Sequence, residues 1–172
     1  EAIRRREGEF LAEVARRAPP PAPRSSVGPL VAAAFPPCIR YMRRSLDAGE
    51  NLSHSGRFAL AAFLHKVGAN ADTIVDSFRG APDFDEGVTR YQVEHITSRD
   101  GGEGYAPPEC ATLRTHGHCM WNGDPAAPEP ADRAPDGLCH ESWLHHPLQY
   151  YRARASRGGA RPEDRRAAPA PG

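Results

Sequence analysis

The chain has 172 residues, enough for one domain with a hydrophobic core and additional terminal segments. It carries 22 basic and 22 acidic residues, which excludes a general attraction to nucleic acid and leaves only local basic patches for that purpose. No run of about 18 apolar residues and no apolar signal segment occurs, so we expect a soluble, cytoplasmic protein without membrane contact.

The two ends of the chain do not resemble its middle. Residues 1–18 carry a weak helical pattern of apolar side chains, and this segment could be the end of a missing domain, since the chain begins at Glu1 without methionine. Residues 19–30 are rich in proline, which cannot continue a helix, and are expected to form an extended linker. We place the folded domain at residues 31–156 and expect the Pro/Ala/Arg-rich tail at 157–172 to be disordered.

Residues 31–96 predict four short helices, because each expected end carries a start or stop signal. Pro37 suits the first position of a helix, Ser53 or Ser55 suits a cap, and Gly68 suits a helix end. The expected ranges are 37–46, a segment from the serines to 68, 71–78, and a segment after the sequence PDFDE. No alternation of the kind found in strands reaches four residues, so the predicted class is mainly α.

The second helix has an apolar side that we expect to be buried, formed by Phe58, Ala62, Phe63 and Val67. On the fourth helix Val88, Tyr91, His95 and Ile96 lie near one face.

Beyond residue 99 the signals for regular structure become sparse. We expect a loop at 99–104, a short helix over 107–115, turns and loops over 122–137, and a last helix within 145–155 opened by Pro147. A region so poor in secondary structure has no evident way to bury itself. A metal centre bound by several cysteines would supply the missing cross-link, since forming such a site contributes directly to folding.

All four cysteines of the chain, Cys38, Cys110, Cys119 and Cys139, lie inside the predicted domain. None forms the C-x2-4-C pair typical of zinc knuckles, so any common site must be assembled by the fold. In an intracellular protein thiols stay reduced, which favours a metal centre over disulfides. Spacing alone leaves a [4Fe-4S] cluster and a four-cysteine zinc site equally open, and His118 and His140 permit mixed ligation. Two disulfides or unlinked thiols are the simpler alternatives.

The sequence DFD at Asp83 to Asp85 resembles the carboxylate pair that holds catalytic metal ions in nucleotidyl transferases. That chemistry needs a strand that points both side chains to one face, whereas these residues precede a predicted helix. We therefore interpret the two carboxylates as a helix cap and a first-turn acid.

A cluster of basic residues is a candidate for a local patch that attracts nucleic acid, which the balanced total charge of the chain does not do. Arg40, Arg43 and Arg44 share a helix face by their spacing, and His54, Arg57 and Lys66 lie on or near the next helix. The arginine fork suits phosphate because it bonds two oxygens at once. The alternative is a charged face that is merely solvated.

Four stretches of the sequence resemble the C-terminal domain of the large subunit of archaeal and eukaryotic DNA primase, in the same order and at about the same spacing. They are FPPCIRYMRRSLDAGENLSHSGRFALAAFLHKVG, APDFDEGVTRYQVEHI, GYAPPECATLRTHGHC and HHPLQYYR, and the resemblance extends over roughly residues 31–152. The resemblance is specific, because the first, third and fourth cysteine contexts of the family are present and no cysteine is left over.

The resemblance implies that the four cysteines bind a [4Fe-4S] cluster. The fold it implies is a compact helical domain whose irregular, loop-rich second half is organised around this cluster. It further implies that the domain forms no phosphodiester bonds itself, because the small subunit of the family has the catalytic carboxylates. Its role is to hold the template and the 5'-triphosphate of the initiating nucleotide. The corresponding residues are His54 and Arg57 in SHSGR, with Tyr91 in TRYQVEH near the template strand.

The sequence departs from the family at two positions. Family members often have a basic residue where this chain has Ser53, and YAPPEC replaces a commoner Thr-Pro pairing. We expect weaker affinity for the triphosphate, or compensation by Lys66.

The implied partners are the catalytic small subunit of primase, template DNA, the RNA primer and a nucleoside triphosphate. We expect residues 1–18 to be at most the end of the N-terminal domain that binds the small subunit, and we therefore expect this chain alone to dock its partner poorly. A zinc-stabilised nucleic-acid-binding module and an iron-sulfur redox protein are the alternative functions. A redox protein would need the sequence motif of another cofactor, and no G-x-G-x-x-G sequence is found.

Overall fold

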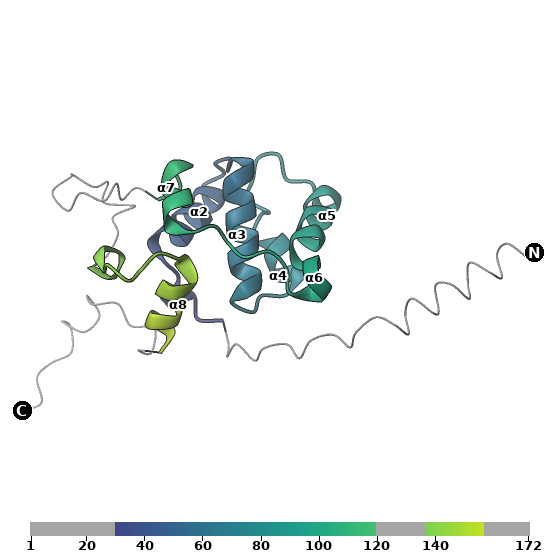
Figure 1. The fold of residues 1–172 in the computed structure, drawn as a ribbon. Coiled ribbons are helices and arrows are strands. Elements are labelled where there is room, and N and C mark those ends of the chain that lie inside the picture. Colours follow the sequence, from purple (N-terminus) through teal and green to yellow (C-terminus); the bar gives the residue numbers. More distant parts are fainter. Residues whose placement is uncertain (1–29, 120–136, 157–172) are drawn as a thin grey trace, which may run out of the picture.

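The computed structural model describes residues 30–119 and 137–156, and these two ranges contain helices but no strand, as the mainly α prediction requires. In chain order the elements are η1 (Ala32–Ala34), α2 (Pro37–Asp47), α3 (His54–Lys66), α4 (Ala71–Asp76), α5 (Glu86–Thr97), α6 (Arg99–Gly102), α7 (Cys110–Thr115), η2 (Gly137–His140) and α8 (Pro147–Ala155) (Figure 1). No helix in these ranges is both long and apolar enough to cross a lipid bilayer. Apart from Leu30, the segments predicted as N-terminal helix, linker and tail lie outside the described residues.

The helices begin where local start signals occur in the sequence. Pro37 and Pro147 occupy the first turns of α2 and α8, where the missing N–H of proline is no loss. Ser53 caps α3 and Asp85 caps α5, each accepting a hydrogen bond from the backbone N–H three residues later. These predictions are confirmed, and Ser53 rather than Ser55 is the cap of α3.

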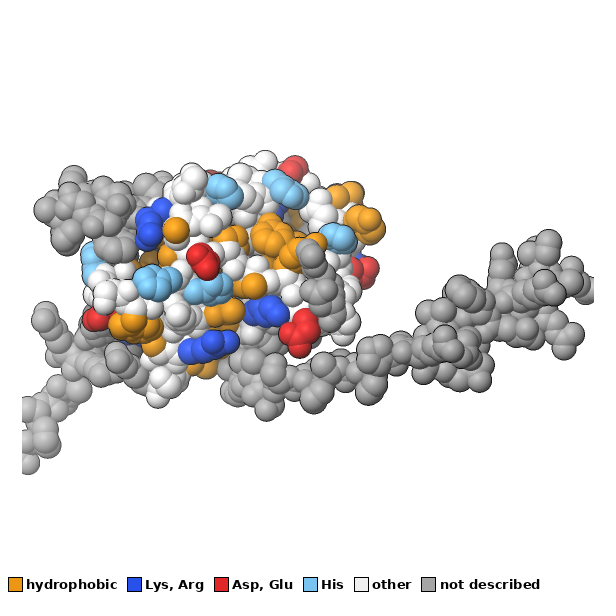
Figure 2. Space-filling view, viewed as in Figure 1, with side chains coloured by type: hydrophobic (Ala, Val, Ile, Leu, Met, Phe, Trp, Pro, Cys, Tyr) orange, Lys and Arg blue, Asp and Glu red, His pale blue; other side chains and the backbone are white. Residues whose placement is uncertain are grey.

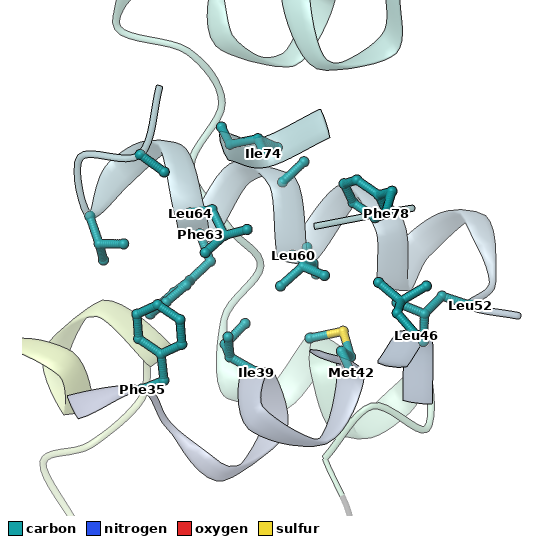
Figure 3. Close-up of a cluster of buried hydrophobic side chains, with 14 of the residues drawn as sticks. Phe35, Ile39, Met42, Leu46, Leu52, Leu60, Phe63, Leu64, Ile74 and Phe78 are labelled. Atoms are coloured by element: carbon teal, nitrogen blue, oxygen red, sulfur yellow. The ribbon is translucent and has the colours of Figure 1, made fainter. Parts of the chain in front are cut away.

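The core lies between α2 and α3 and continues on the other side of α3 toward α4. Apolar side chains of α2 point at the facing side of α3, and residues of α4 and the turn after it close the opposite side (Figure 3). The labelled members are Phe35, Ile39, Met42, Leu46, Leu52, Leu60, Phe63, Leu64, Ile74 and Phe78, all less than a tenth exposed. This packing fixes α3 as the central helix.

An aromatic cluster fastens the C-terminal helix to the start of the domain. Tyr151 of α8 packs edge-on against Phe63 at 5.9 Å between ring centroids, and Phe35 lies 5.3 Å from the same phenylalanine. The backbone N–H of Val31 donates a hydrogen bond of 3.1 Å to the Tyr151 hydroxyl oxygen. Residues at the two ends of the described chain are therefore joined through one buried side chain.

The face of α5 that carries Val88 and Tyr91 is exposed. Val88 is 57% exposed and Tyr91 is 73% exposed, whereas the buried side of the helix consists of Thr89 and Val93. The helix packs against α3 and α4, which places threonine rather than the larger apolar residues at the contact. Two large apolar side chains are consequently left on the surface of α5.

Three boundaries also differ from the prediction. The third helix, α4, ends at Asp76 rather than at residue 78, and α7 begins only at Cys110. The loop predicted from residue 99 is wrong for Arg99–Gly102, which form α6 directly after α5. Two glycines lower helix propensity, but a single turn that continues from a formed helix needs little propensity of its own.

Candidate functional site

The four cysteine side chains line one cavity, which we call the cysteine cavity. They come from three helical elements and one turn: Cys38 from the first turn of α2, Cys110 from the start of α7, Cys119 from the turn after α7, and Cys139 from η2. The rest of the lining is mostly apolar and includes Leu113, Leu144, Tyr150 and three prolines, together with Tyr41, Arg114 and His118. The fold therefore brings together thiols that are far apart in the sequence.

Backbone hydrogen bonds hold the two irregular segments around this cavity. The Cys110 N–H donates to the His145 carbonyl oxygen at 2.9 Å, which joins the start of α7 to the segment before α8. The Cys119 N–H donates to the Leu113 carbonyl oxygen at 3.2 Å, so the chain turns back on α7 to present its second thiol. Leu113, only 1% exposed, is the buried anchor of α7.

The thiols of the cavity form no disulfide, and all four are partly buried. Burial raises the pKa of Cys38 well above its ordinary value, and the neighbouring thiols Cys119, Cys110 and Cys139 raise it further. Burial together with Cys119 also raises the pKa of Cys110 to about 11. Four thiolates in this cavity would repel one another, so their ionisation requires a positively charged centre among them.

Within the described residues, no three histidine, cysteine or acidic side chains are grouped as ligands of a single metal ion. The four thiols share the lining of one cavity, and this lining alone favours neither zinc nor an iron-sulfur cluster.

The two histidines considered as mixed ligands occupy different environments. His118 is 8% exposed, and its Nε2 atom is hydrogen-bonded to Ser55 Oγ at 2.9 Å. Burial lowers the pKa of its imidazole, with a smaller contribution from His116. His140 is exposed in η2. Neither histidine is needed to complete a set of four thiol ligands.

A second cavity, which we call the α3–α5 pocket, opens between the start of α3 and the exposed face of α5. Its volume is about 440 Å³. Three of the residues predicted from the sequence, His54, Arg57 and Tyr91, line it together. The other lining residues are Phe58, Ala61, Phe78, Thr89, Gln92, Val93, His95, Ile96 and Tyr105.

Arg57 is held at the mouth of the α3–α5 pocket by three acceptors. Its Nε atom donates to the Leu52 carbonyl oxygen at 3.1 Å, and its Nη2 atom donates to Asn51 and to Asp83, the latter at 2.5 Å. Only 21% of the Arg57 side chain is exposed, against 56% for Asp83. The guanidinium is thus oriented before any ligand binds, with an exposed carboxylate on one side.

The two carboxylates of the DFD sequence have separate structural roles. Asp85 caps α5 through a 2.8 Å hydrogen bond from the Val88 N–H, as predicted. The capping or first-turn interpretation is wrong for Asp83, which lies before the helix and pairs with Arg57. The hydrogen bond from Arg57 lowers the pKa of Asp83.

An aromatic wall lines the interior of the α3–α5 pocket. Phe58 and Tyr105 meet edge-on with their ring centroids 5.5 Å apart, and His95 lies 6.1 Å from Tyr105. Phe58 is half-buried and faces this pocket, so its predicted place in the core is wrong. The sequence placed His95 near one helix face with Tyr91, four residues before it, and both side chains line this pocket. Tyr105 has no local sequence signal, because only the loop after α6 brings it to this wall.

The remaining residues predicted to bind nucleotide or nucleic acid do not line the α3–α5 pocket. Lys66, at the far end of α3, donates a 2.6 Å hydrogen bond to the Glu103 carbonyl oxygen and does not line the pocket. Arg40, Arg43 and Arg44 are on α2, outside the pocket lining, and the Arg43 guanidinium lies 5.6 Å from the centroid of the Phe35 ring. On the face shown in Figure 2, basic side chains are scattered among apolar and histidine side chains rather than gathered in one block.

The chain matches a known protein family. The matching family model describes the C-terminal domain of the large subunit of eukaryotic and archaeal DNA primase, and it covers residues 28–131. A DNA primase large subunit PriL from Thermoplasma acidophilum is 47% identical over 120 residues, covering 70% of this chain and 32% of that protein. The PriL proteins of Thermoplasma volcanium and Halobacterium salinarum are 44% and 36% identical, over 73% and 72% of this chain and 35% and 30% of theirs.

The chain spans about a third of the length of the curated relatives that it matches. No solved structure matches it.

Proposed function

The chain belongs to the family formed by the C-terminal domain of the large subunit of eukaryotic and archaeal DNA primase, and from this premise we propose that it is an iron-sulfur domain that supports the start of primer synthesis. It acts as a non-catalytic part of primase that binds the template and the 5'-triphosphate of the initiating nucleotide. The observation that carries the proposal is the meeting of His54, Arg57 and Tyr91 in one pocket at the start of α3. Tyr91 is distant from the other two in the sequence, yet the fold gathers the three residues that the family resemblance singled out.

The α3–α5 pocket suits a nucleotide because it combines a cationic mouth with an aromatic interior. The first turn of α3 is at the positive end of the helix dipole, which is favourable to an anion. Arg57 adds a fork whose donors match phosphate oxygens, and His54 lies on the same turn. Deeper in the pocket, Tyr105 and Phe58 offer ring surfaces on which a base can stack.

The cysteine cavity suits a [4Fe-4S] cluster held by Cys38, Cys110, Cys119 and Cys139. The donor set contains four thiols and mainly apolar neighbours, which is the usual environment of such clusters. When bound, the cluster supplies the positive charge that keeps four neighbouring thiolates ionised, and a cross-link between α2, α7 and η2. Leu113, Leu144 and Tyr150 exclude water from one side of the cavity.

Bond formation belongs to the catalytic small subunit in this proposal. The two acidic residues of this chain that resembled a catalytic pair are engaged otherwise, Asp85 as a cap and Asp83 with Arg57. The exposed Tyr91, beside the pocket on α5, is placed to contact a template strand while the triphosphate occupies the mouth. The domain then holds both components for the small subunit.

The test is binding of a primer-template junction whose primer bears either a 5'-triphosphate or a 5'-hydroxyl, followed by fluorescence anisotropy at fixed salt. The chain should prefer the triphosphate junction, and Arg57→Ala should weaken that binding by roughly 1 to 3 kcal/mol, the range for losing a charge-assisted contact. The hydroxyl junction should change much less. Arg152→Ala, which removes an exposed arginine of α8, is the matched control for lost charge.

Equal losses of affinity for both junctions would mean that Arg57 contacts the nucleic-acid backbone without recognising the triphosphate. No loss on either junction would remove it from the site.

A further inference from the structure

The cysteine cavity and the α3–α5 pocket are joined through one buried histidine. His118 directly precedes Cys119, and its Nε2 atom contacts both serines at the start of α3, Ser55 Oγ at 2.9 Å and Ser53 Oγ at 3.3 Å. The same two serines flank His54, a residue of the pocket mouth. One imidazole therefore touches the turn that presents a cysteine and the turn that begins the proposed phosphate site.

The close approach of the imidazole to α3 depends on Gly56. A Cβ atom at this position would lie 2.9 Å from His118 Cε1, closer than side chains normally approach. Gly56 is also the residue whose N–H donates to Ser53 Oγ, at 3.2 Å, in the cap of α3. The histidine thus packs directly on the capping turn, and a larger residue at position 56 would separate them.

The position of His118 is set by the end of α7. Gly117 has a φ of 73°, which lets the chain reverse there, and the His118 N–H donates to the Leu113 carbonyl oxygen at 2.8 Å. The Cys119 N–H donates to the same carbonyl oxygen. His118 and Cys119 therefore move together, because one backbone turn carries both.

We propose that His118 is a positioning residue that fixes the first turn of α3 to the loop of Cys119, and so makes phosphate binding at His54 and Arg57 depend on an ordered cysteine cavity. The dependence of phosphate binding on His118 rests on the proposed function. The attachment of the first turn of α3 to the turn of Cys119 through His118 does not. Because coupling between two sites is reciprocal, a triphosphate at the pocket mouth should also protect the Cys119 loop from opening.

The test compares His118→Ala, His118→Gln and the control His116→Ala, which removes an exposed histidine from the same turn. The first measurement is hydrogen exchange of the backbone amides in the first turn of α3. We expect His118→Ala to speed this exchange roughly five-fold, the factor that corresponds to the free energy of one neutral hydrogen bond. The exchange rates of the amides of Leu60 to Leu64 should be unchanged. Glutamine can place an amide nitrogen near the position of Nε2, so His118→Gln should recover part of the protection.

The second measurement is the ratio of affinities for the triphosphate and hydroxyl junctions. His118→Ala should lower this ratio several-fold although every residue of the pocket is intact, and His116→Ala should leave it unchanged. If His118→Ala also loses iron, Ser55→Ala breaks the same hydrogen bond from the α3 side and should give the same two effects with iron retained.

Unchanged exchange at the start of α3 in both His118→Ala and Ser55→Ala would overturn the proposed link. A wild-type chain without any preference for the triphosphate would contradict the proposed function instead, and the exchange measurement would then decide on the link alone.

Discussion

Replacing Cys110 by serine tests whether the cysteine cavity holds the second half of the domain together. The substitution changes one atom at the start of α7 and removes one thiol from the cavity. Serine cannot replace a thiolate ligand of an iron-sulfur cluster well, so iron should be lost. The consequence for stability follows from how little else secures this region.

Few apolar side chains anchor the segments around the cavity. Leu113 is the buried residue of α7, η2 buries none, and Leu144 is the main buried side chain between η2 and α8. Two fully buried leucines contribute about 3–6 kcal/mol, whereas ordering even ten residues costs about 10–20 kcal/mol in backbone entropy. Structural zinc in zinc-finger peptides contributes about 10–16 kcal/mol at neutral pH, and a metal centre with a contribution of that size would make up the difference.

We therefore expect Cys110→Ser to lose its iron and to lower the thermal midpoint by more than about 10 °C in the same preparation. Limited proteolysis should then cut residues 103–146 while the core of α2 to α5 stays protected. Thr112→Ser, an exposed change on the same helix, is the matched control and should keep both iron and midpoint. A variant that loses iron but melts like the wild type would refute the cross-link argument.

Three further changes test individual contacts. Because Asp85 is a helix cap, Asp85→Asn should lower the unfolding free energy by about 1 kcal/mol or less and leave primer synthesis by the complete primase largely intact. A folded variant that abolishes synthesis would instead indicate that Asp85 binds a catalytic metal. The lowered pKa of Asp83 means that its contact with Arg57 stabilises the fold above the unfolded-state pKa of about 3.9 and is lost as pH falls through the folded value. The difference in thermal midpoint between Asp83→Asn and the wild type should accordingly shrink as the pH falls below about 4. At pH 7 the variant should bind the triphosphate junction more tightly, since no carboxylate competes for Arg57. Tyr151→Phe should destabilise by about 1 kcal/mol in denaturant unfolding through loss of the bond from Val31, and an unchanged midpoint would show that this bond contributes nothing.

The helix starts could be predicted from the sequence because their causes are local. Pro37, Ser53, Asp85 and Pro147 each act within a few residues of themselves, through a fixed φ or a side-chain cap. The burial of α5 could not be predicted in the same way. Which of its faces is buried depends on the helices it meets, and these expose Val88 although its pattern favours burial.

The candidate site was predictable only where the family resemblance marked its residues. The spacing of the four cysteines left zinc and iron-sulfur centres open, and only the fold shows that the thiols share one cavity. The pairing of Asp83 with Arg57 and the place of Tyr105 in the pocket join loops that are distant in the sequence. No local pattern encodes contacts of this kind, since they depend on how whole helices are arranged.

Metal analysis of the anaerobically purified chain tests the central claim most directly. Iron, acid-labile sulfide and zinc would be measured on one sample, together with its absorption spectrum. We expect about four irons and four sulfides per chain, negligible zinc, and a brown protein with broad absorption near ~400 nm. A colourless protein with about one zinc per chain and no iron would contradict the proposed cluster, because zinc has a filled d shell and gives no such absorption.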